Sequence, residues 1–179
     1  MKAVFLDRDG VLNEAVVRGG KPYSPASVEE VVISADAPAA LASLRQHGYR
    51  LIMATNQPDI ARKLMPRETV ERINRFICDS LPIDAVEMCE HDDSDNCECR
   101  KPRPGLLTRA AKRDGIDLAQ SFMIGDRWSD IEAGRSAGCR TVLIGNGYGD
   151  ITLPPHAAVR NLADAAAWIV AQSLEQRRP

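Results

Sequence analysis

The sequence lacks any apolar run long enough to cross a lipid bilayer. Stretches such as residues 51–54 fall far below the roughly 18 to 20 residues that a membrane span requires. Charged residues 7–9 also interrupt the apolar segment at the N-terminus. We therefore expect no membrane segment and no signal peptide, and we expect the protein to be cytoplasmic.

An excess of charge of either sign is also missing. Lys and Arg total 23 and Asp and Glu total 25, so the formal net charge is −2. Proteins that bind nucleic acids nonspecifically rely on a broad positive field. Nucleic acid is therefore not expected as a partner, and any recognition of phosphate must be local.

The chain is too short for a second large domain. Its 179 residues correspond to one domain at about 100 to 200 residues per domain. Hydrophobic residues make up 44% and charged residues 27%, which is typical of a soluble globular protein, and internal repeats and long linkers are absent. We predict that residues 1–179 form one domain, and we expect a monomer.

The chain has five cysteines, an odd number, so they cannot all pair in disulfide bonds within the chain. Three crowd around a histidine in residues 89–99, which we call the zinc loop. The four side chains are Cys89, His91, Cys97 and Cys99. A Cys₃His set suits tetrahedral Zn²⁺, and four protein ligands make such an ion structural. The alternative is a polar loop with free thiols.

Short apolar runs alternate with segments of helical periodicity. Strands are predicted at residues 2–6, 51–54, 85–88, 122–124 and 141–144, and helices at about 37–47, 70–81, 105–114, 130–137 and 162–174. This alternation indicates an α/β fold, a single Rossmann-like doubly wound parallel sheet with helices on both faces. Residues 145–155 are predicted to be a surface loop and 175–179 a frayed tail.

Reactive side chains follow the predicted strands. Asp7 and Asp9 come directly after the first strand. One carboxylate can attack phosphorus while another acid protonates the leaving oxygen and later activates water. Asp126 follows a later strand, and carboxylate oxygens suit Mg²⁺, so Asp7 and Asp126 could share one ion. Taken singly, Asp7 and Asp9 could form an ordinary polar turn, and Asp126 could be an acid at a helix N-terminus. Asp130 could likewise be an acid at a helix N-terminus, or a brace for the loop.

Hydroxyl, amide and cationic donors follow two further segments. Thr55, Asn56 and Gln57 come after the second predicted strand, and Arg100 and Lys101 come after the cysteines. Donors and cations aimed at phosphoryl oxygens stabilise the transition state of phosphoryl transfer. Each group alone could instead be a turn or a solvated surface pair.

The order of these motifs resembles the haloacid dehalogenase superfamily of aspartate-nucleophile phosphatases. The matching stretches are DRDG at 7–10, TNQ at 55–57, RKP at 100–102 and GDRWSD at 125–130, and the resemblance covers about residues 2–145. It implies that Asp7 is the nucleophile and Asp9 the general acid and base. It implies further that Thr55 and Lys101 stabilise the phosphate, and that Asp126 binds Mg²⁺ with Asp7 and the backbone carbonyl of Asp9.

The spacing leaves no room for a separate cap domain. Only 45 residues separate Asp9 from Thr55, and 45 separate Thr55 from Lys101. Specificity must then come from loops, chiefly residues 14–25, the segment after Gln57, and the zinc loop.

Longer motifs resemble one branch of capless enzymes, the D,D-heptose 1,7-bisphosphate 7-phosphatases, and their relatives, the histidinol-phosphate phosphatases. They are DRDGVLN at 7–13, TNQPDIAR at 55–62 and CRKPRPG at 99–105. The resemblance implies a small phosphorylated sugar as substrate, in the synthesis of surface-polysaccharide precursors. Asn56, Gln57, Arg100 and Arg127 are the expected substrate contacts.

Two branches and one other class of function stay open. Residues 60–62 (IAR) favour the heptose branch, whereas the five-residue gap between His91 and Cys97 resembles the histidinol branch. Pro58-Asp59 replaces the usual Ser-Gly of the heptose enzymes, and the acids of the zinc loop would repel a second phosphate. A noncatalytic, zinc-stabilised phosphate-binding module is the alternative from another class, and the complete set of reactive residues argues against it.

Overall fold

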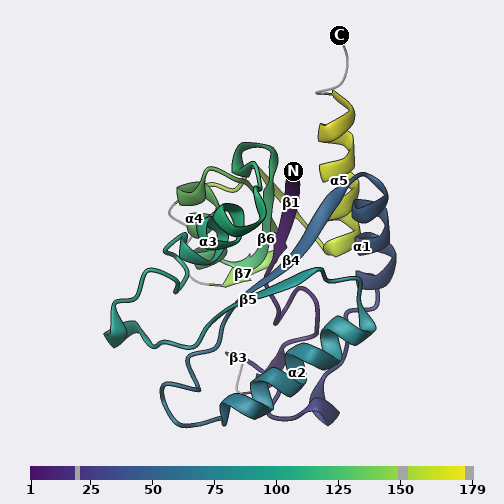
Figure 1. The fold of residues 1–179 in the computed structure, drawn as a ribbon. Coiled ribbons are helices and arrows are strands. Elements are labelled where there is room, and N and C mark those ends of the chain that lie inside the picture. Colours follow the sequence, from purple (N-terminus) through teal and green to yellow (C-terminus); the bar gives the residue numbers. More distant parts are fainter. Residues whose placement is uncertain (19–20, 149–152, 176–179) are drawn as a thin grey trace.

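A computed structural model describes residues 1–18, 21–148 and 153–175 of the chain. Its centre is a parallel six-stranded sheet in the order β5-β4-β1-β6-β7-β8 (Figure 1). The strands are β1 (Lys2–Leu6), β4 (Tyr49–Asn56), β5 (Ala85–Cys89), β6 (Phe122–Arg127), β7 (Arg140–Tyr148) and β8 (Ala157–Val159). The predicted doubly wound α/β fold is confirmed.

Helices cover both faces of this sheet. On one face lie α1 (Ala37–Gln46), α2 (Arg67–Ser80) and α5 (Leu162–Glu175); on the other lie α3 (Gly105–Asp114) and α4 (Trp128–Ala137). Alternate residues of β1 point to opposite faces, so Val4 and Leu6 join one apolar cluster while Ala3 and Phe5 join the other. Because both faces are buried, the strands read as continuous apolar runs in the sequence.

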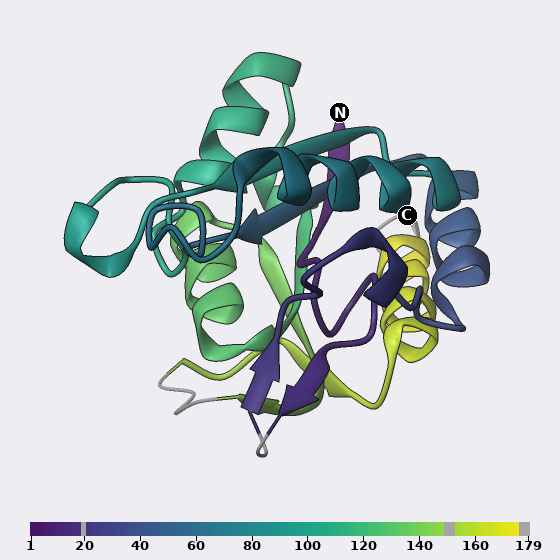
Figure 2. The same ribbon diagram turned by 90° about the horizontal axis from the view of Figure 1, so that it is seen from below.

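Three short 3₁₀ helices and one hairpin complete the fold. The 3₁₀ helices are η1 (Val28–Glu30), η2 (Asp93–Asp95) and η3 (Leu118–Gln120). The antiparallel hairpin of β2 (Val16–Arg18) and β3 (Lys21–Tyr23) lies in the segment expected only as a specificity loop. Figure 2 looks onto the carboxyl ends of the sheet strands and shows this hairpin beside them. In the described parts of the chain no separate cap domain interrupts the sheet.

One predicted loop is wrong over residues 145–148, because β7 continues to Tyr148. The pairing of β6 with β7 shifts between Gly125 and Arg127, and Arg127 then pairs with Tyr148. Gly145 and Gly147 adopt φ of +69° and +74°, conformations that glycine permits at little cost. The turn-forming residues therefore make an irregular strand, while residues 149–152 and 176–179, part of the predicted loop and tail, lie outside the described residues.

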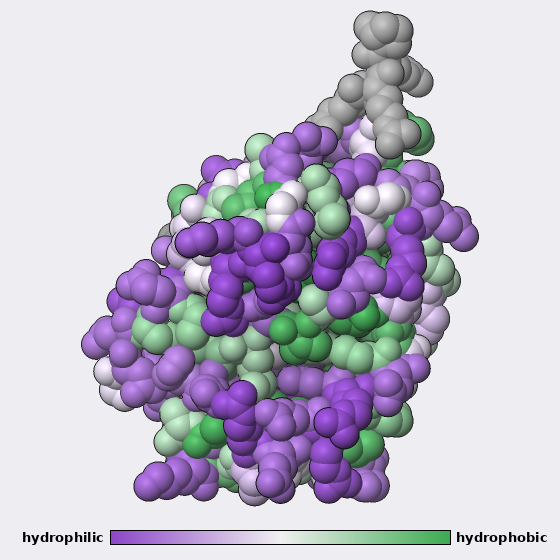
Figure 3. All heavy atoms as spheres, viewed as in Figure 1, coloured by the Kyte–Doolittle hydropathy of each residue, from purple (hydrophilic) through white to green (hydrophobic). Residues whose placement is uncertain are grey.

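None of the helices described between residues 1 and 175 is both long and apolar enough to cross a membrane. Hydrophilic residues cover most of the face seen in Figure 3, and hydrophobic residues gather chiefly across its middle.

Candidate active site

Three neighbouring central strands deliver their polar ends to one edge of the sheet. Asp7 follows β1, Thr55 lies near the end of β4, and Asp126 lies near the end of β6. All three side chains are buried, as are Asp9 and Lys101. Ligands of open parallel sheets gather at this edge, so the sequence motifs meet where the fold builds a site.

Lys101 lies at the centre of an acidic cluster. Its Nζ donates to Oδ1 of Asp7 at 2.7 Å and lies 2.6 Å from Oδ1 of Asp130. It also donates to the carbonyl of Ala54 at 2.7 Å. Burial disfavours the ammonium, but the negative charges of Asp130 and Asp7 outweigh this and hold the pKa of Lys101 above its usual value. Lys101 is therefore a fixed cation beside Asp7.

Asn56 anchors the segment that carries this cation. Its Nδ2 donates to the carbonyl of Lys101 at 3.0 Å, and its Oδ1 accepts the backbone N–H of Lys101 at 3.1 Å. Both ends of the amide are thus engaged by the backbone. The structure places Asn56, a predicted substrate contact, where it positions Lys101.

The carboxylate of Asp9 is held on several sides. Nε and Nη2 of Arg8 donate to its two oxygens at 3.2 and 2.9 Å. Ser24 and Asn13 donate at 2.7 and 3.1 Å. Burial raises the pKa of Asp9, but the charge and hydrogen bonds of Arg8, with those of Ser24 and Asn13, outweigh it and lower the net pKa. The free enzyme therefore holds Asp9 as an oriented anion.

Gln57 links Asp9 to the end of β4. Its Nε2 donates to Oγ1 of Thr55 at 2.9 Å and lies 3.3 Å from Oδ2 of Asp9. Its Oε1 accepts from Nη2 of Arg8 at 3.1 Å. The side chain is only 2% exposed, so Gln57, another predicted substrate contact, is part of the buried network that orients Thr55 and Asp9.

Three carboxylates converge with oxygens free to bind a cation. Asp7, Asp126 and Asp130 each offer an oxygen within 4.8 Å of the others. Neither oxygen of Asp126 has a hydrogen-bond partner among the described residues, although both are buried. Burial, and then the charges of Asp7 and Asp130, raise the pKa of Asp126 to about 8. This set of hard oxygen donors, with both oxygens of Asp126 free of hydrogen bonds in the described part of the chain, fits Mg²⁺.

Gly10 lets the aspartate loop close onto Asp126. It has φ of +86°, and a Cβ built there would lie 2.2 Å from Oδ2 of Asp126. Any larger residue would therefore push the carboxylate away. The glycine of the DRDG motif thus has a steric role in the cation site.

The four side chains of the zinc loop also come together. Their Sγ atoms lie 3.2 to 3.6 Å apart, and Nδ1 of His91 lies 3.6 Å from Sγ of Cys89 and 3.3 Å from Sγ of Cys99. A tetrahedral site with Zn–S bonds of about 2.3 Å has ligands roughly 3.8 Å apart. The donor set and its spacing fit zinc, and the loop leads directly into Arg100 and Lys101.

Two predicted substrate contacts, Arg100 and Arg127, are partly exposed. Nε of Arg100 donates to Oδ1 of Asp93 at 2.7 Å. The side chain of Arg127 is 40% exposed, and its Nε lies 3.7 Å from Oδ1 of Asp126. Arg62 makes a similar ion pair with Asp92 at 2.9 Å. Acids of the zinc loop therefore form ion pairs with two arginines, Arg62 and Arg100.

Sequence reasoning missed two residues of the network, Arg8 and Asn74. Arg8 is fully buried, and its charge, placed between two aspartates, was the available signal. Asp130, read as a helix N-terminal acid or a loop brace, accepts from the backbone N–H of Arg127 and also pairs with Lys101. Asn74 lies on the buried face of α2 beside Ile73 and Ile77; one polar residue on an apolar helical face was its only trace in the sequence.

Comparison with known proteins identifies the class that this fold and site define. A family model described as HAD-hydrolase-like matches residues 98–175. A crystal structure of D,D-heptose 1,7-bisphosphate phosphatase from B. bronchiseptica, complexed with magnesium and phosphate, matches with a TM-score of 0.83 and 32% identity, covering 96% of this chain and 99% of that one. The chain is thus a HAD-like phosphatase.

Curated relatives define the family within that class. The chain is 35% identical over 161 residues to the D-glycero-beta-D-manno-heptose-1,7-bisphosphate 7-phosphatase of Bordetella bronchiseptica, covering 86% of each protein. It is 36% identical over 149 residues to the Helicobacter pylori protein of the same name, covering 80% of this chain and 83% of that protein. The chain belongs to this family of heptose bisphosphate phosphatases.

Proposed function

We propose that the protein is a Mg²⁺-dependent phosphomonoesterase that removes the 7-phosphate of D-glycero-D-manno-heptose 1,7-bisphosphate, in the synthesis of nucleotide-activated heptose for surface polysaccharides. The observation that carries the chemistry is the buried carboxylate of Asp126, neither oxygen of which accepts a hydrogen bond from the described residues, beside Asp7. Lys101 holds Asp7 in place. The substrate follows from the family, whose relatives are named for the β anomer.

The proposed reaction has two displacements. An oxygen of Asp7 attacks the phosphorus, the bond to the sugar oxygen breaks, and Asp9 gives that oxygen a proton. Water then attacks the aspartyl phosphate while Asp9 takes its proton, and inorganic phosphate leaves. A bound phosphate dianion adds negative charge beside Asp9 and raises its pKa, which supplies the acid form in the complex.

The remaining residues stabilise charge and hold geometry. Lys101 and the hydroxyl of Thr55 would stabilise the phosphoryl oxygens. Asp7, Asp126 and the backbone carbonyl of Asp9 would hold the Mg²⁺, which neutralises the phosphate charge when bound. Asn56 and Gln57 support this constellation, and Arg100 and Arg127 would contact the substrate beyond the transferred phosphate.

The substrate is tested by phosphate release with Mg²⁺ from both anomers of the heptose bisphosphate, histidinol phosphate and common sugar phosphates. We expect kcat/KM for the β anomer to exceed the others by about a hundredfold, or roughly 2.7 kcal/mol of transition-state discrimination. A preference for histidinol phosphate would instead place the chain with the enzymes that its short zinc loop resembles.

Magnesium binding should stabilise the protein in a pH-dependent way. Burial raises the pKa of Asp126 to about 8 and that of Asp130 to about 6, so in the metal-free protein Asp126 is mostly neutral below about pH 8 and Asp130 below about pH 6. Ionisation of these groups in the fold costs free energy, and stability should fall as pH rises from about 4 to 8. We expect Mg²⁺ to raise Tm more at pH 8 than at pH 5.

Differential scanning fluorimetry of chelator-treated protein checks this expectation. The variant Asp126→Asn should lose most of the fall in Tm above about pH 6, where Asp130, with a pKa of about 6, contributes little further change, and most of the response to Mg²⁺. An equal Mg²⁺ response at both pH values would contradict the assignment of the cation to these carboxylates.

We propose further that the Cys₃His cluster holds one structural zinc ion. Elemental analysis should find about one zinc per chain in purified protein, and Cys99→Ser should lower both zinc content and Tm because three ligands seldom complete a closed site. Cys139→Ser, a buried cysteine outside the loop, is the matched control and should keep its zinc. Folded wild-type protein without zinc would refute the site.

We infer that one chain suffices for activity, as a single-domain monomer in the cytoplasm. Every proposed catalytic side chain comes from the same chain, and the zinc thiolates require a reducing compartment. Light scattering at assay concentration should give the mass of one chain.

A further inference from the structure

Arg8 requires support from outside the active-site loops. A guanidinium carries five N–H donors in one rigid plane, and a buried charge is costly unless its donors are satisfied. Arg8 is 0% exposed. Its Nε and Nη2 face Asp9, and Nη2 is shared with Gln57. The third nitrogen of the guanidinium, Nη1, points away from Asp9.

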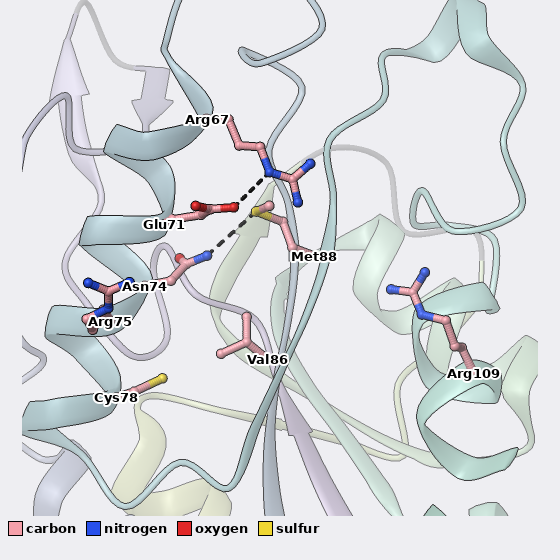
Figure 4. A pocket seen from close by; sticks show the side chains of 8 residues that line it. All are labelled: Arg67, Glu71, Asn74, Arg75, Cys78, Val86, Met88 and Arg109. Atoms are coloured by element: carbon pink, nitrogen blue, oxygen red, sulfur yellow. Dashed lines mark hydrogen bonds and ion pairs between the residues drawn. The ribbon is translucent and has the colours of Figure 1, made fainter. Parts of the chain in front are cut away.

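Asn74 of α2 is the hydrogen-bond acceptor for Nη1 of Arg8. Its Oδ1 accepts from Nη1 of Arg8 at 2.9 Å, across 66 positions of sequence. Its Nδ2 donates to Sδ of Met88 at 3.6 Å, as the dashed line in Figure 4 shows. Since Arg8 offers only donors, the oxygen of the amide must face it. Asn74 is 6% exposed, so its orientation is fixed by packing as well.

We propose that Asn74 is a positioning residue for the general acid, acting through Arg8. Asn13, Ser24 and Gln57 hold the Asp9 end of the pair from the loops. Asn74 adds a point on a packed helix, which ties the guanidinium plane of Arg8 to the scaffold. With Arg8 fixed, the Asp9 carboxyl is held at the angle from which its proton reaches the leaving sugar oxygen. This inference rests on the proposed role of Asp9.

A comparison of leaving groups tests the inference. A sugar alkoxide must receive a proton as its bond to phosphorus breaks, whereas p-nitrophenolate leaves without one. The ratio kcat/KM covers the steps up to departure of the leaving group. For Asn74→Leu we expect kcat/KM for the heptose bisphosphate to fall about tenfold, a part of the general-acid effect, with less than about twofold change for p-nitrophenyl phosphate.

Two further variants separate positioning from packing. Asn74→Asp keeps an acceptor for Nη1 and should retain at least about half of the wild-type kcat/KM on the heptose substrate. Cys78 lies one turn further along α2 and lines the same groove of ≈ 390 Å³ as Asn74 (Figure 4). Cys78→Ala should leave kcat/KM unchanged for both the heptose bisphosphate and p-nitrophenyl phosphate. Equal losses on both substrates in Asn74→Leu, or no loss on either, would overturn the proposal.

Asp9→Asn distinguishes failure of this inference from failure of the proposed mechanism. A selective loss on the alkyl substrate in Asp9→Asn, without one in Asn74→Leu, refutes only the role of Asn74. An equal loss of kcat/KM on both substrates in Asp9→Asn refutes Asp9 as the acid.

Discussion

Asp7→Asn should abolish turnover while the protein stays folded. The carboxylate is the proposed nucleophile, and an amide oxygen is too weak a nucleophile to replace it, so we expect kcat to fall by about 10⁴-fold or more. Asn has nearly the same shape, and its Oδ1 can still accept from Nζ of Lys101, which lies 2.7 Å from Oδ1 of Asp7. Steady-state kinetics and a circular dichroism spectrum check both halves of the prediction.

The control for Asp7→Asn is Asp164→Asn on α5, where the partly exposed carboxylate pairs with Arg160. It should keep wild-type kcat, because surface ion pairs contribute little and the site is untouched. A covalent intermediate gives a second readout, since acid-quenched wild-type enzyme should carry phosphate and Asp7→Asn should carry none. Near-normal kcat in a carefully purified Asp7→Asn sample would exclude the aspartyl-phosphate mechanism.

The sheet could be predicted because its strands are buried on both faces. Residues 2–6 and 105–114 were placed with the bounds that β1 and α3 have. The hairpin β2–β3 was not predicted, since three-residue strands carry too few positions for an alternating pattern. The extension of β7 was hidden by Gly145 and Gly147, because glycines that permit an irregular strand are the same residues that mark turns.

The reactive groups were visible in sequence, but their supports were not. Asp7, Asp126 and Lys101 follow strands or motifs, so local pattern placed them at one edge. The partners of those groups depend on contacts between distant elements: Asn56 binds the backbone of Lys101, and Asn74 binds Arg8. No local pattern specifies which side chain of a helix faces a buried guanidinium, and the amides were therefore read as substrate contacts or passed over.

Lys101→Met should be damaging to both catalysis and stability. It removes the cation held between Asp7 and Asp130 and leaves these acids, and Asp126, buried without it. Loss of a preorganised charge at the phosphoryl group lowers kcat by about 10²- to 10³-fold. Removal of one partner from a buried ion pair costs about 3–5 kcal/mol of unfolding free energy.

The stability loss in Lys101→Met should depend on pH. Burial raises the pKa of Asp130 to about 6 even though Lys101 opposes the shift, so the variant raises this pKa further. Protonated Asp130 needs no cation, and the deficit is therefore smaller at pH 5 and grows as pH rises toward 8. Urea unfolding of metal-free wild type and variant at the two pH values measures it.

Lys112→Met, an exposed lysine on α3, is the matched control and should change the free energy of unfolding by no more than about 0.5 kcal/mol at either pH. A deficit in Lys101→Met that is the same at pH 5 and pH 8 would mean that lost packing, and not uncompensated negative charge, destabilises the variant. In that case the acidic cluster does not depend on Lys101 for its neutralisation. A pH-dependent deficit that Mg²⁺ reduces would instead show that one cation, whether ammonium or metal, must balance these carboxylates for the site to exist.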